Sequence, residues 1–313
     1  MAQESLVAAP RARSRPSLVH DIMRNRWAYI FISPFFILFF IFQAFPIGYS
    51  VYLSLYEWDG LGPMEYVGLK NYDFLLNPGG KAFQQSLQNG VILFFMYVPI
   101  MTLLAIVLAV LLNSKRVRGY RVYRTILFMP YITSMIAAGI TFQLLLQQDN
   151  GFFNVVLQTV GVSPQPWLET KWLARFSLCL LIVWGWLGYN MVIMLAGLQT
   201  IPHELTEAAR IDGANAVQAF FRITIPLLRP VILFSVILST IGSFGLFNET
   251  QALFRSTRGS GPLRSTLTPL VFIYDQAFGR FRLGRAAAAG YLYFAFIFVL
   301  TLVQLKYFGR EED

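Results

Sequence analysis

Long apolar segments alternate with short polar segments along most of this chain. Each apolar segment has roughly 20 or more residues, the length that an α-helix needs to cross the ~30 Å hydrocarbon core of a bilayer. The segments are residues 27–55, 87–112, 126–146, 176–198, 227–246 and 286–307. We therefore expect an all-α, polytopic membrane protein with about six transmembrane helices, kinked at internal prolines such as Pro99 and Pro130.

The composition indicates the same class of protein. Hydrophobic residues make up 56% of the chain and charged residues 13%, with a mean hydropathy of +0.55. Soluble domains carry about 25% charged residues. Residues 1–26 differ from the rest, being rich in Ala, Pro, Arg and Ser. We expect a disordered, basic, cytoplasmic tail there, followed by a transmembrane domain at residues 27–313.

Positive charge predicts the orientation of the helices. Arginines gather in the tail and again at residues 113–125, and loops of this kind stay on the cytoplasmic side. Both termini are then cytoplasmic. The segment 251–285 departs from the rule, because it holds six arginines against Asp275 and yet falls outside if the spans alternate. Its stretch 263–278 is too short and too polar for a further span, so we expect it to re-enter the membrane or to lie on the surface.

Several classes of function are disfavoured. Cys179 is the single cysteine, which excludes an internal disulfide. The chain has no Gly-x-x-x-x-Gly-Lys-Ser/Thr phosphate loop, and His20 and His203 lack partners at metal-ligand or catalytic spacing. The net charge of +9 lies mostly in the predicted cytoplasmic segments, where lipid and topology explain it better than nucleic acid. We expect no enzyme active site, no metal and no cofactor bound by this chain.

The segment 200–226 is the most distinctive polar stretch. Pro202 suits the first turn of a helix, Glu204 and Glu207 suit its positive end, and Gly213 permits a bend before a second short helix at 214–221. Alanines leave little side-chain bulk here, so the groove of a partner protein could close around the backbone. An amphipathic surface helix without a partner is the alternative that the spacing leaves open.

Motifs in and around this segment resemble a known family. Glu207-Ala208-Ala209, then Gly213, then Ile223-x-Ile225-Pro226 is similar to the cytoplasmic loop of the permease subunits of bacterial ABC importers. Other motifs resemble the carbohydrate-uptake branch, which includes the maltose and glycerol-3-phosphate permeases. They are Trp186-Leu-Gly188-Tyr189, Leu198-Gln-Thr-Ile-Pro202, Asp212-Gly213-Ala214 and Gly259-x-Gly261-Pro262. The large external insertion of the maltose permease is missing, and Ile225 and Ser260 stand where that family usually has Leu and Gly.

The resemblance implies a type I ABC importer permease fold, of the first-permease type, in the inner membrane of a prokaryote. It implies as partners a second homologous permease, two ATPase subunits that bind ATP and Mg²⁺, an extracytoplasmic solute-binding protein and a sugar-like substrate. The loop 200–226 would contain the coupling helix that docks in a cleft of the ATPase. The residues carried over to that role are Glu207, Ala208, Ala209, Arg210, Asp212, Gly213 and Pro226.

The same resemblance places the substrate near mid-membrane, beside the fourth and fifth spans. The residues mapped there are Trp186, Gly188, Tyr189, Asn190, Ser243, Asn248, Glu249 and Gln251, with Trp184 as a further aromatic. Aromatic faces suit the C–H surfaces of a sugar, while amides, hydroxyls and a carboxylate suit its hydroxyl groups. An interfacial aromatic belt and hydrogen bonds between helices are the alternatives for these side chains.

A rival hypothesis is an ion- or proton-coupled secondary transporter that works without an ATPase. Such a protein would need ionisable groups buried in several spans, together with internal repeats. The predicted spans hold few ionisable groups. Amino-acid or peptide permeases of the importer class lack the sugar-branch motifs given above.

Overall fold

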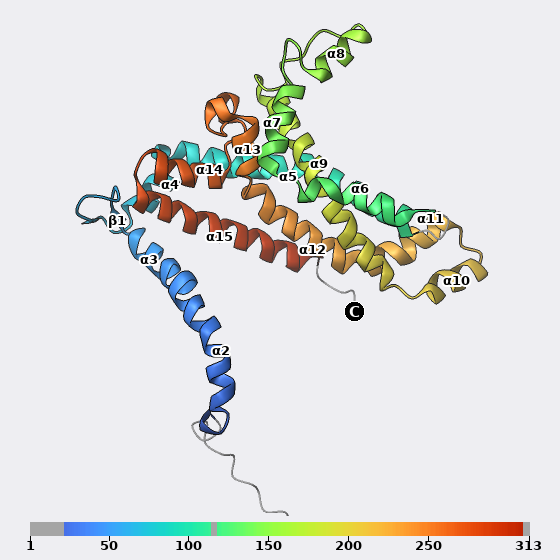
Figure 1. The fold of residues 1–313 in the computed structure, drawn as a ribbon, viewed down its shortest axis with the longest axis horizontal. Coiled ribbons are helices and arrows are strands. Elements are labelled where there is room, and N and C mark those ends of the chain that lie inside the picture. The colour runs from blue at the N-terminus through green and yellow to red at the C-terminus, as the bar shows by residue number, and fades with distance from the viewer. Residues whose placement is uncertain (1–21, 114–117, 309–313) are drawn as a thin grey trace, which may run out of the picture. The chain divides into compact units, whose positions relative to one another are not determined.

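The computed structural model describes residues 22–113 and 118–308 and divides into two units, residues 1–52 and 53–313 (Figure 1). Most of the tail at 1–26 lies outside the described residues. In the first unit, α2 (Arg26–Phe39), the π-helical turn η1 (Phe40–Ala44) and α3 (Phe45–Leu53) form one apolar helix of 28 residues. The wide turn lies just before Pro46, whose nitrogen cannot donate to the preceding turn.

The second unit is a helical bundle. Its long helices are α5 (Lys81–Asn113), α9 (Lys171–Gln199), α12 (Ile225–Phe244) and α15 (Leu283–Phe308). Shorter helices join them, namely α4 (Lys70–Leu76), α6 (Tyr120–Ile132), α7 (Met135–Leu145), α8 (Phe152–Thr159), α10 (His203–Ile211), α11 (Ala216–Ala219), α13 (Asn248–Leu253) and α14 (Pro269–Tyr274). Two short strands, β1 (Tyr56–Glu57) and β2 (Glu65–Tyr66), pair antiparallel and place Tyr56 opposite Tyr66.

The spans follow the predicted runs, with one exception. Five described helices are long and apolar enough to cross a membrane: Arg26–Leu53, Pro78–Asn113, Lys171–Gln199, Ala216–Phe244 and Leu283–Tyr307. The predicted run at 126–146 is not one straight helix, because α6 and α7 meet there at an angle of 92°. Counting that bent pair as one span gives six.

The bend between α6 and α7 has a local cause. Thr133 ends α6 in an extended conformation, with φ −78° and ψ 155°. Ser134 then begins a new helix, because its hydroxyl oxygen accepts a hydrogen bond from the N–H of Ala137 at 3.4 Å. A capping serine satisfies a backbone donor that the broken helix would otherwise leave unpaired.

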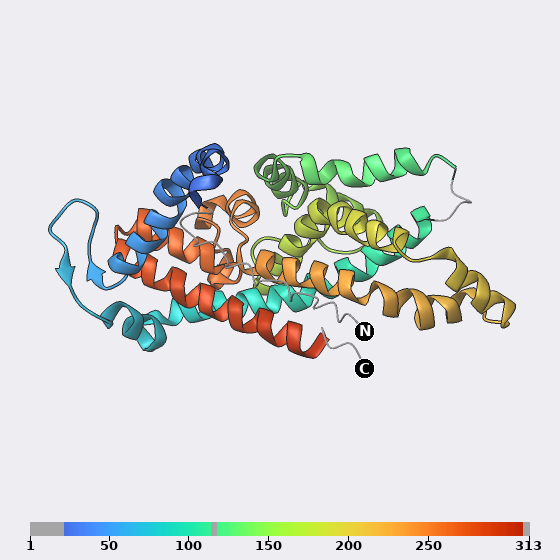
Figure 2. The ribbon, with the colours of Figure 1, turned by 90° about the horizontal axis from the view of Figure 1, so that it is seen from below.

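The core of the bundle lies between α5 and α9, which pack side by side. Leu93 from α5 and Leu178 and Leu181 from α9 are completely buried there. The α6 helix runs along α9 (Figure 2) and approaches it very closely at Gly188, where an added Cβ atom would lie 2.0 Å from the carbonyl oxygen of Leu127. Only a residue without a side chain allows the two backbones this distance.

The arginine-rich segment 251–285 folds back onto the bundle. It contains α14, the 3₁₀ turns η4 (Arg255–Thr257) and η5 (Pro262–Arg264) and the π turn η6 (Asp275–Gly279). The side chains of Ser265, Thr266 and Thr268 are completely buried, and the Thr268 hydroxyl donates to the carbonyl of Leu246 at 2.6 Å. The segment therefore forms a packed end of the bundle and no described helix in it is long enough to span a membrane.

Candidate functional site

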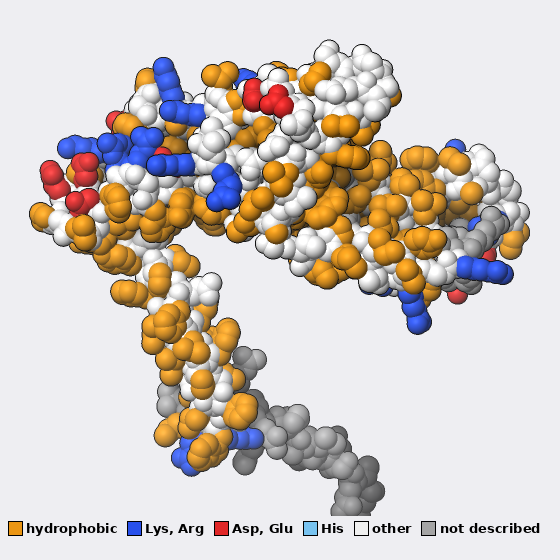
Figure 3. Space-filling view, turned by 45° about the horizontal axis from the view of Figure 1, so that its top comes forward, with side chains coloured by type: hydrophobic (Ala, Val, Ile, Leu, Met, Phe, Trp, Pro, Cys, Tyr) orange, Lys and Arg blue, Asp and Glu red, His pale blue; other side chains and the backbone are white. Residues whose placement is uncertain are grey.

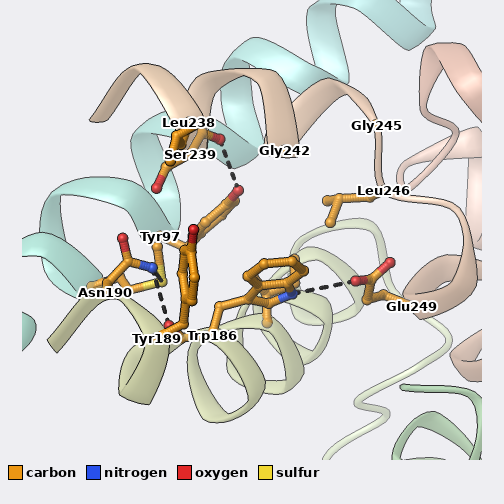
Figure 4. A pocket seen from close by; sticks show the side chains of 12 residues that line it. Tyr97, Trp186, Tyr189, Asn190, Leu238, Ser239, Gly242, Gly245, Leu246 and Glu249 are labelled. Carbon is orange, nitrogen blue, oxygen red and sulfur yellow. Dashed lines mark hydrogen bonds between the residues drawn. The ribbon is translucent and has the colours of Figure 1, made fainter. Parts of the chain in front are cut away.

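A cavity of about 310 Å³ opens in the middle of the bundle (Figure 4). It lies between α5, α9 and α12, and the turn from Gly245 into α13 closes one side. The lining residues are Tyr97, Met101, Ile182, Trp186, Tyr189, Asn190, Leu238, Ser239, Gly242, Gly245, Leu246 and Glu249. A volume of this size, apolar with a few convergent polar groups, is typical of a small-molecule site.

Two aromatic rings form one wall of the cavity. Trp186 and Tyr189 lie one helical turn apart on α9, and their ring centroids are 6.0 Å apart. Tyr131 of α6 supports them, since it stacks on Tyr189 at 4.7 Å and contacts Trp186 edge to face at 5.3 Å. The support from a second helix holds the aromatic wall in a fixed orientation.

The carboxylate of Glu249 forms the polar end of the cavity. Glu249 lies in the first turn of α13 and is only 7% exposed. The indole Nε1 of Trp186 donates to its Oε1 at 3.4 Å. Among the described residues that line the cavity, none is Lys or Arg. An ionisable group that is costly to bury and lacks a cationic neighbour marks a functional position by default.

Asn190 and Tyr97 supply the other polar groups. Asn190 Nδ2 donates to the carbonyl of Trp186 at 3.0 Å, and its Oδ1 accepts from the Ser235 hydroxyl at 2.6 Å. The Tyr97 hydroxyl lies 2.9 Å from Ser243 Oγ and 3.3 Å from the carbonyl of Ser239. These bonds tie α5, α9 and α12 together around the cavity, so its polar atoms are positioned before any ligand arrives.

The structure brings only some of the mapped substrate residues to this cavity. Trp186, Tyr189, Asn190 and Glu249 line it, whereas the remaining mapped residues do not. Ser243 forms a hydrogen bond with the Tyr97 hydroxyl and does not itself line the cavity. Gly188 faces α6, whose backbone approaches it too closely to leave space for a ligand. The others outside the lining are Trp184, Asn248 and Gln251.

Sequence reasoning missed the residues that α5 and α12 contribute. Tyr97 and Met101 lie four residues apart on α5, and Ser239 is four residues before Ser243 on α12. This four-residue spacing of serines predicts that α12 has a polar face. Nothing local in α5 indicates that Tyr97 faces α12, because only the packing of the helices brings them together.

The predicted coupling segment, unlike the buried cavity, is an exposed projection at one end of the bundle (Figure 1). The α10 helix ends at Ile211, and Gly213, two residues further on, has a φ of +86°. The N–H of Ala214 donates to the carbonyl of Ala209 at 2.8 Å, and the N–H of Gly213 donates to that of Arg210 at 3.1 Å. This pair of bonds is a Schellman motif, the helix end that glycine favours.

The second half of that segment differs from the predicted isolated helix at 214–221. The α11 helix begins with a capping box between Asn215 and Gln218 and continues through the π turn η3 (Phe220–Thr224) into α12. The wide turn again precedes a proline, Pro226, which lacks the backbone donor of a regular turn. The fifth span is therefore one helix from Ala216 to Phe244, and α11 forms its first turn.

Side chains of the segment face outward. Glu207, Ala208, Arg210 and Asp212 are exposed, and Ala209 is partly exposed. Large apolar side chains are exposed beside them, namely Leu205, Ile211, Val217 and Phe221. Ile211 is 87% exposed. Apolar groups gathered on a polar projection are typical of a protein-binding surface.

The chain is similar to known transport proteins over most of its length. Residues 84–310 match the family described as "Binding-protein-dependent transport system inner membrane component". The chain is 37% identical over 302 residues to the lactose transport system permease protein LacF of Rhizobium radiobacter, covering 96% of this chain and 98% of that protein. It is 36% identical over 282 residues to the arabinooligosaccharides transport system permease protein AraP of Bacillus subtilis (strain 168), covering 90% and 88%.

A solved structure shares the fold. It is a bacterial ABC transporter involved in the import of the acidic polysaccharide alginate, and it matches with a TM-score of 0.78 and 22% sequence identity over 95% of this chain and 99% of that one. The all-α, multi-span permease fold expected from the sequence is thereby confirmed. The family match covers well over half of the chain, so this protein belongs to the family of binding-protein-dependent transport system inner membrane components.

Proposed function

We propose that this chain forms half of the transmembrane pathway of an ATP-driven importer for a sugar, an oligosaccharide or a polyol derivative. Similarity to permeases named for lactose and for arabinooligosaccharides, over nearly the full chain, supports the sugar class. In this proposal a second, homologous permease supplies the other half, and an extracytoplasmic solute-binding protein delivers the substrate. Both termini lie on the cytoplasmic side, with Glu207 and its neighbours.

The central cavity is the observation that carries the proposal. Its aromatic wall, Trp186 and Tyr189, offers flat faces for the C–H surfaces of a sugar ring. Glu249 offers two acceptor oxygens and Asn190 an amide, which suit hydroxyl groups that both donate and accept. A neutral polyhydroxylated ligand matches such a site, because it needs no cation and gains from both kinds of contact.

The segment 200–226 would couple this site to ATP hydrolysis. Two ATPase subunits bind ATP and Mg²⁺ in the proposal, and a cleft on one of them receives α10 and the exposed Ile211. Because α11 runs through η3 into α12 as one helix from Ala216 to Phe244, a push on α10 would pass across the turn at Gly213 into a helix that reaches Ser239 and the cavity. ATP binding then biases the bundle between two packings, as alternating access requires.

The rival secondary transporter would move sugar without nucleotide. Membership in a binding-protein-dependent family favours the importer. The test is a reconstitution of the purified complex with its binding protein in proteoliposomes, followed by uptake of labelled arabinooligosaccharide and lactose. We expect uptake that requires ATP and the binding protein. Uptake driven by an ion gradient alone would refute the proposal.

A further inference from the structure

A second hollow, of about 550 Å³, is lined by residues at the end of the bundle opposite the coupling segment. Figure 1 shows the elements of that end, and Figure 3 shows Lys and Arg side chains gathered over it. The α4 helix, the loop that contains η4 and η5, the π turn η6 and the start of α15 surround it. Its basic lining residues are Lys81, Arg258, Arg264, Arg280, Arg282 and Arg285. The acid among its described lining residues is Asp275. We call this feature the cationic hollow.

The charges in the cationic hollow do not balance. Six basic groups less one acid leave a formal charge of +5. Asp275 is already engaged, since its Oδ2 accepts from Arg280 Nε at 2.7 Å. No described residue forms an ion pair with Lys81, Arg258 or Arg264. Like charges held together repel one another, and a bound anion relieves that repulsion.

Acids on the neighbouring hairpin form no ion pair with the arginines of the hollow, although the charge of Glu57 acts on Arg285. An adjoining hollow shares Arg280, Arg282 and Arg285 with the cationic hollow. Its acidic lining residues are Glu57, Asp59 and Glu65. None of the three acids comes within 4.0 Å of those arginines. Asp59 instead accepts hydrogen bonds from the N–H groups of Leu61 and Gly62, at 2.9 and 2.8 Å, which lower its pKa. The other three basic residues of the cationic hollow do not line the adjoining hollow, and no described acid forms an ion pair with them. They are Lys81, Arg258 and Arg264.

Buried polar atoms in the hollow also lack partners. Gln276 is 5% exposed, and its side-chain oxygen has no hydrogen-bond partner among the described residues. The Nε of Arg285 is buried and likewise unpaired, although its guanidinium carbon lies 3.7 Å above the ring of Phe74. Buried polar groups are nearly always hydrogen-bonded in folded proteins. The N–H at Arg285 Nε is a donor that a bound anion can satisfy, whereas the Gln276 oxygen is an acceptor and does not itself call for an anion.

The loop that carries Arg258 and Arg264 is held in a strained conformation. Both residues have positive φ, +51° and +57°, although neither is glycine. The amide of Asn89 donates to the carbonyls of Arg264 and Leu267 at 2.8 and 2.9 Å, and the buried Arg175 donates to that of Ser265 at 3.1 Å. Strain that the surroundings maintain in this way is typical of ligand-binding segments.

We propose that the cationic hollow receives carboxylate side chains of the extracytoplasmic binding protein, and so forms the electrostatic part of its docking surface. The inference rests on the proposed function. Guanidinium groups bind carboxylates through paired hydrogen bonds, which fixes the orientation of a partner as well as attracting it. The hollow lies at the end of the bundle opposite α10, and that end is extracytoplasmic if α10 meets the ATPase.

Carboxylates of an acidic saccharide are the other source of the same chemistry, and the central cavity argues against them. Glu249 lines that cavity, and no Lys or Arg accompanies it among the described lining residues. A uronate that bound in the cationic hollow would meet a like charge at the next site. The side chains of Arg258 and Arg264 are exposed, within reach of a folded protein.

The test uses the purified importer and its binding protein. The rate of association is measured between 0.05 and about 0.5 M NaCl, a range over which screening removes electrostatic attraction. The double variant Arg258→Gln/Arg264→Gln removes two charges of the hollow. Arg255→Gln is the matched control, because Arg255 is an exposed arginine of the same loop that does not line the hollow.

We expect the double variant to associate at least about tenfold more slowly at low salt, with the difference disappearing at high salt, because charge complementarity acts mainly on the rate of encounter. Arg255→Gln should behave as the unmodified protein does. Hexaglutamate should slow docking to the unmodified importer and have no effect on the double variant.

Equal association rates for the double variant and the unmodified protein, at all salt concentrations, would overturn the proposal. Competition by trigalacturonate but not by hexaglutamate would also overturn it, in favour of a saccharide site. Basal ATP hydrolysis and co-purification of the ATPase are measured on the same samples. If both are normal while docking is unchanged, only this inference fails; if no ATPase co-purifies with the unmodified chain, the proposed function fails.

Discussion

Trp186 and Glu249 are joined across the edge of the central cavity, where the indole Nε1 donates to the carboxylate Oε1 at 3.4 Å. The bond connects α9 to α13, so a helix of the core and the arginine-rich end of the bundle share one site. At this length the bond is weak. A sugar hydroxyl that donates to Glu249 can therefore bind without displacing a strong internal partner.

The charge of Glu249 should matter for affinity. Glu249→Gln keeps the size of the side chain and removes its charge. We expect the apparent affinity for sugar to fall about fivefold, because hydrogen bonds to charged groups are stronger than those to neutral groups by roughly 1 kcal/mol. Uptake in proteoliposomes measures this, with assembly of the complex as the control. An unchanged affinity would remove Glu249 from the site.

The aromatic wall should be sensitive to loss of its ring. We expect Trp186→Ala to reduce sugar affinity more than Trp186→Phe does, since Phe preserves most of the stacking face, worth about 1 kcal/mol. Trp184→Ala is the control, because Trp184 lies on the same helix, packs against Phe142 and is absent from the cavity lining. Equal effects of Trp184→Ala and Trp186→Ala on sugar affinity would indicate a general packing defect.

Gly188 should act through stability and not through substrate contact. The Cβ of Gly188→Ala would press on the backbone of α6, so we expect a loss of about 1–3 kcal/mol in stability. Thermal denaturation of the purified complex in detergent measures it. Gly290→Ala is the matched control, because an added Cβ at that position meets nothing within 4 Å. Equal denaturation temperatures for the two variants would contradict the close approach of α6 and α9.

The exposed coupling segment should tolerate substitution without unfolding. Glu207 is exposed at the end of the bundle, so we expect Glu207→Arg to leave the melting temperature unchanged while sugar uptake is lost. The same charge reversal on the hairpin, Glu65→Arg, is a control that should leave the ATPase bound. Normal uptake by Glu207→Arg would exclude the proposed role of the segment.

The sequence predicts the parts of this structure that depend on one helix at a time. Run length predicts about six spans, five of which are continuous helices in the structure. The family resemblance assigned Trp186, Tyr189 and Asn190 to the substrate, and their spacing puts them on one face of α9. The bend between α6 and α7 was harder to find, because Thr133 and Ser134 lie within an apolar run that reads as continuous. Pro130 was the available signal, and it indicates a kink without its angle.

The rest of the site depends on contacts between helices. Tyr97 reaches the cavity because α5 packs between α9 and α12, and no local pattern in α5 records that neighbour. Gly188 was mapped to the substrate on its residue type, since close approach of a ligand and close approach of a helix both require glycine. Only the position of α6 distinguishes the two.

The measurement that tests the central proposal most directly is the composition and activity of the complex isolated through this chain. The tagged protein is solubilised from its native membrane, the proteins that co-purify are identified by mass spectrometry, and ATP hydrolysis is followed as binding protein and sugar are added. We predict an ATPase and a second permease in the complex, with hydrolysis that rises on addition of sugar-loaded binding protein. A lone chain that transports sugar after reconstitution without ATP would contradict the account.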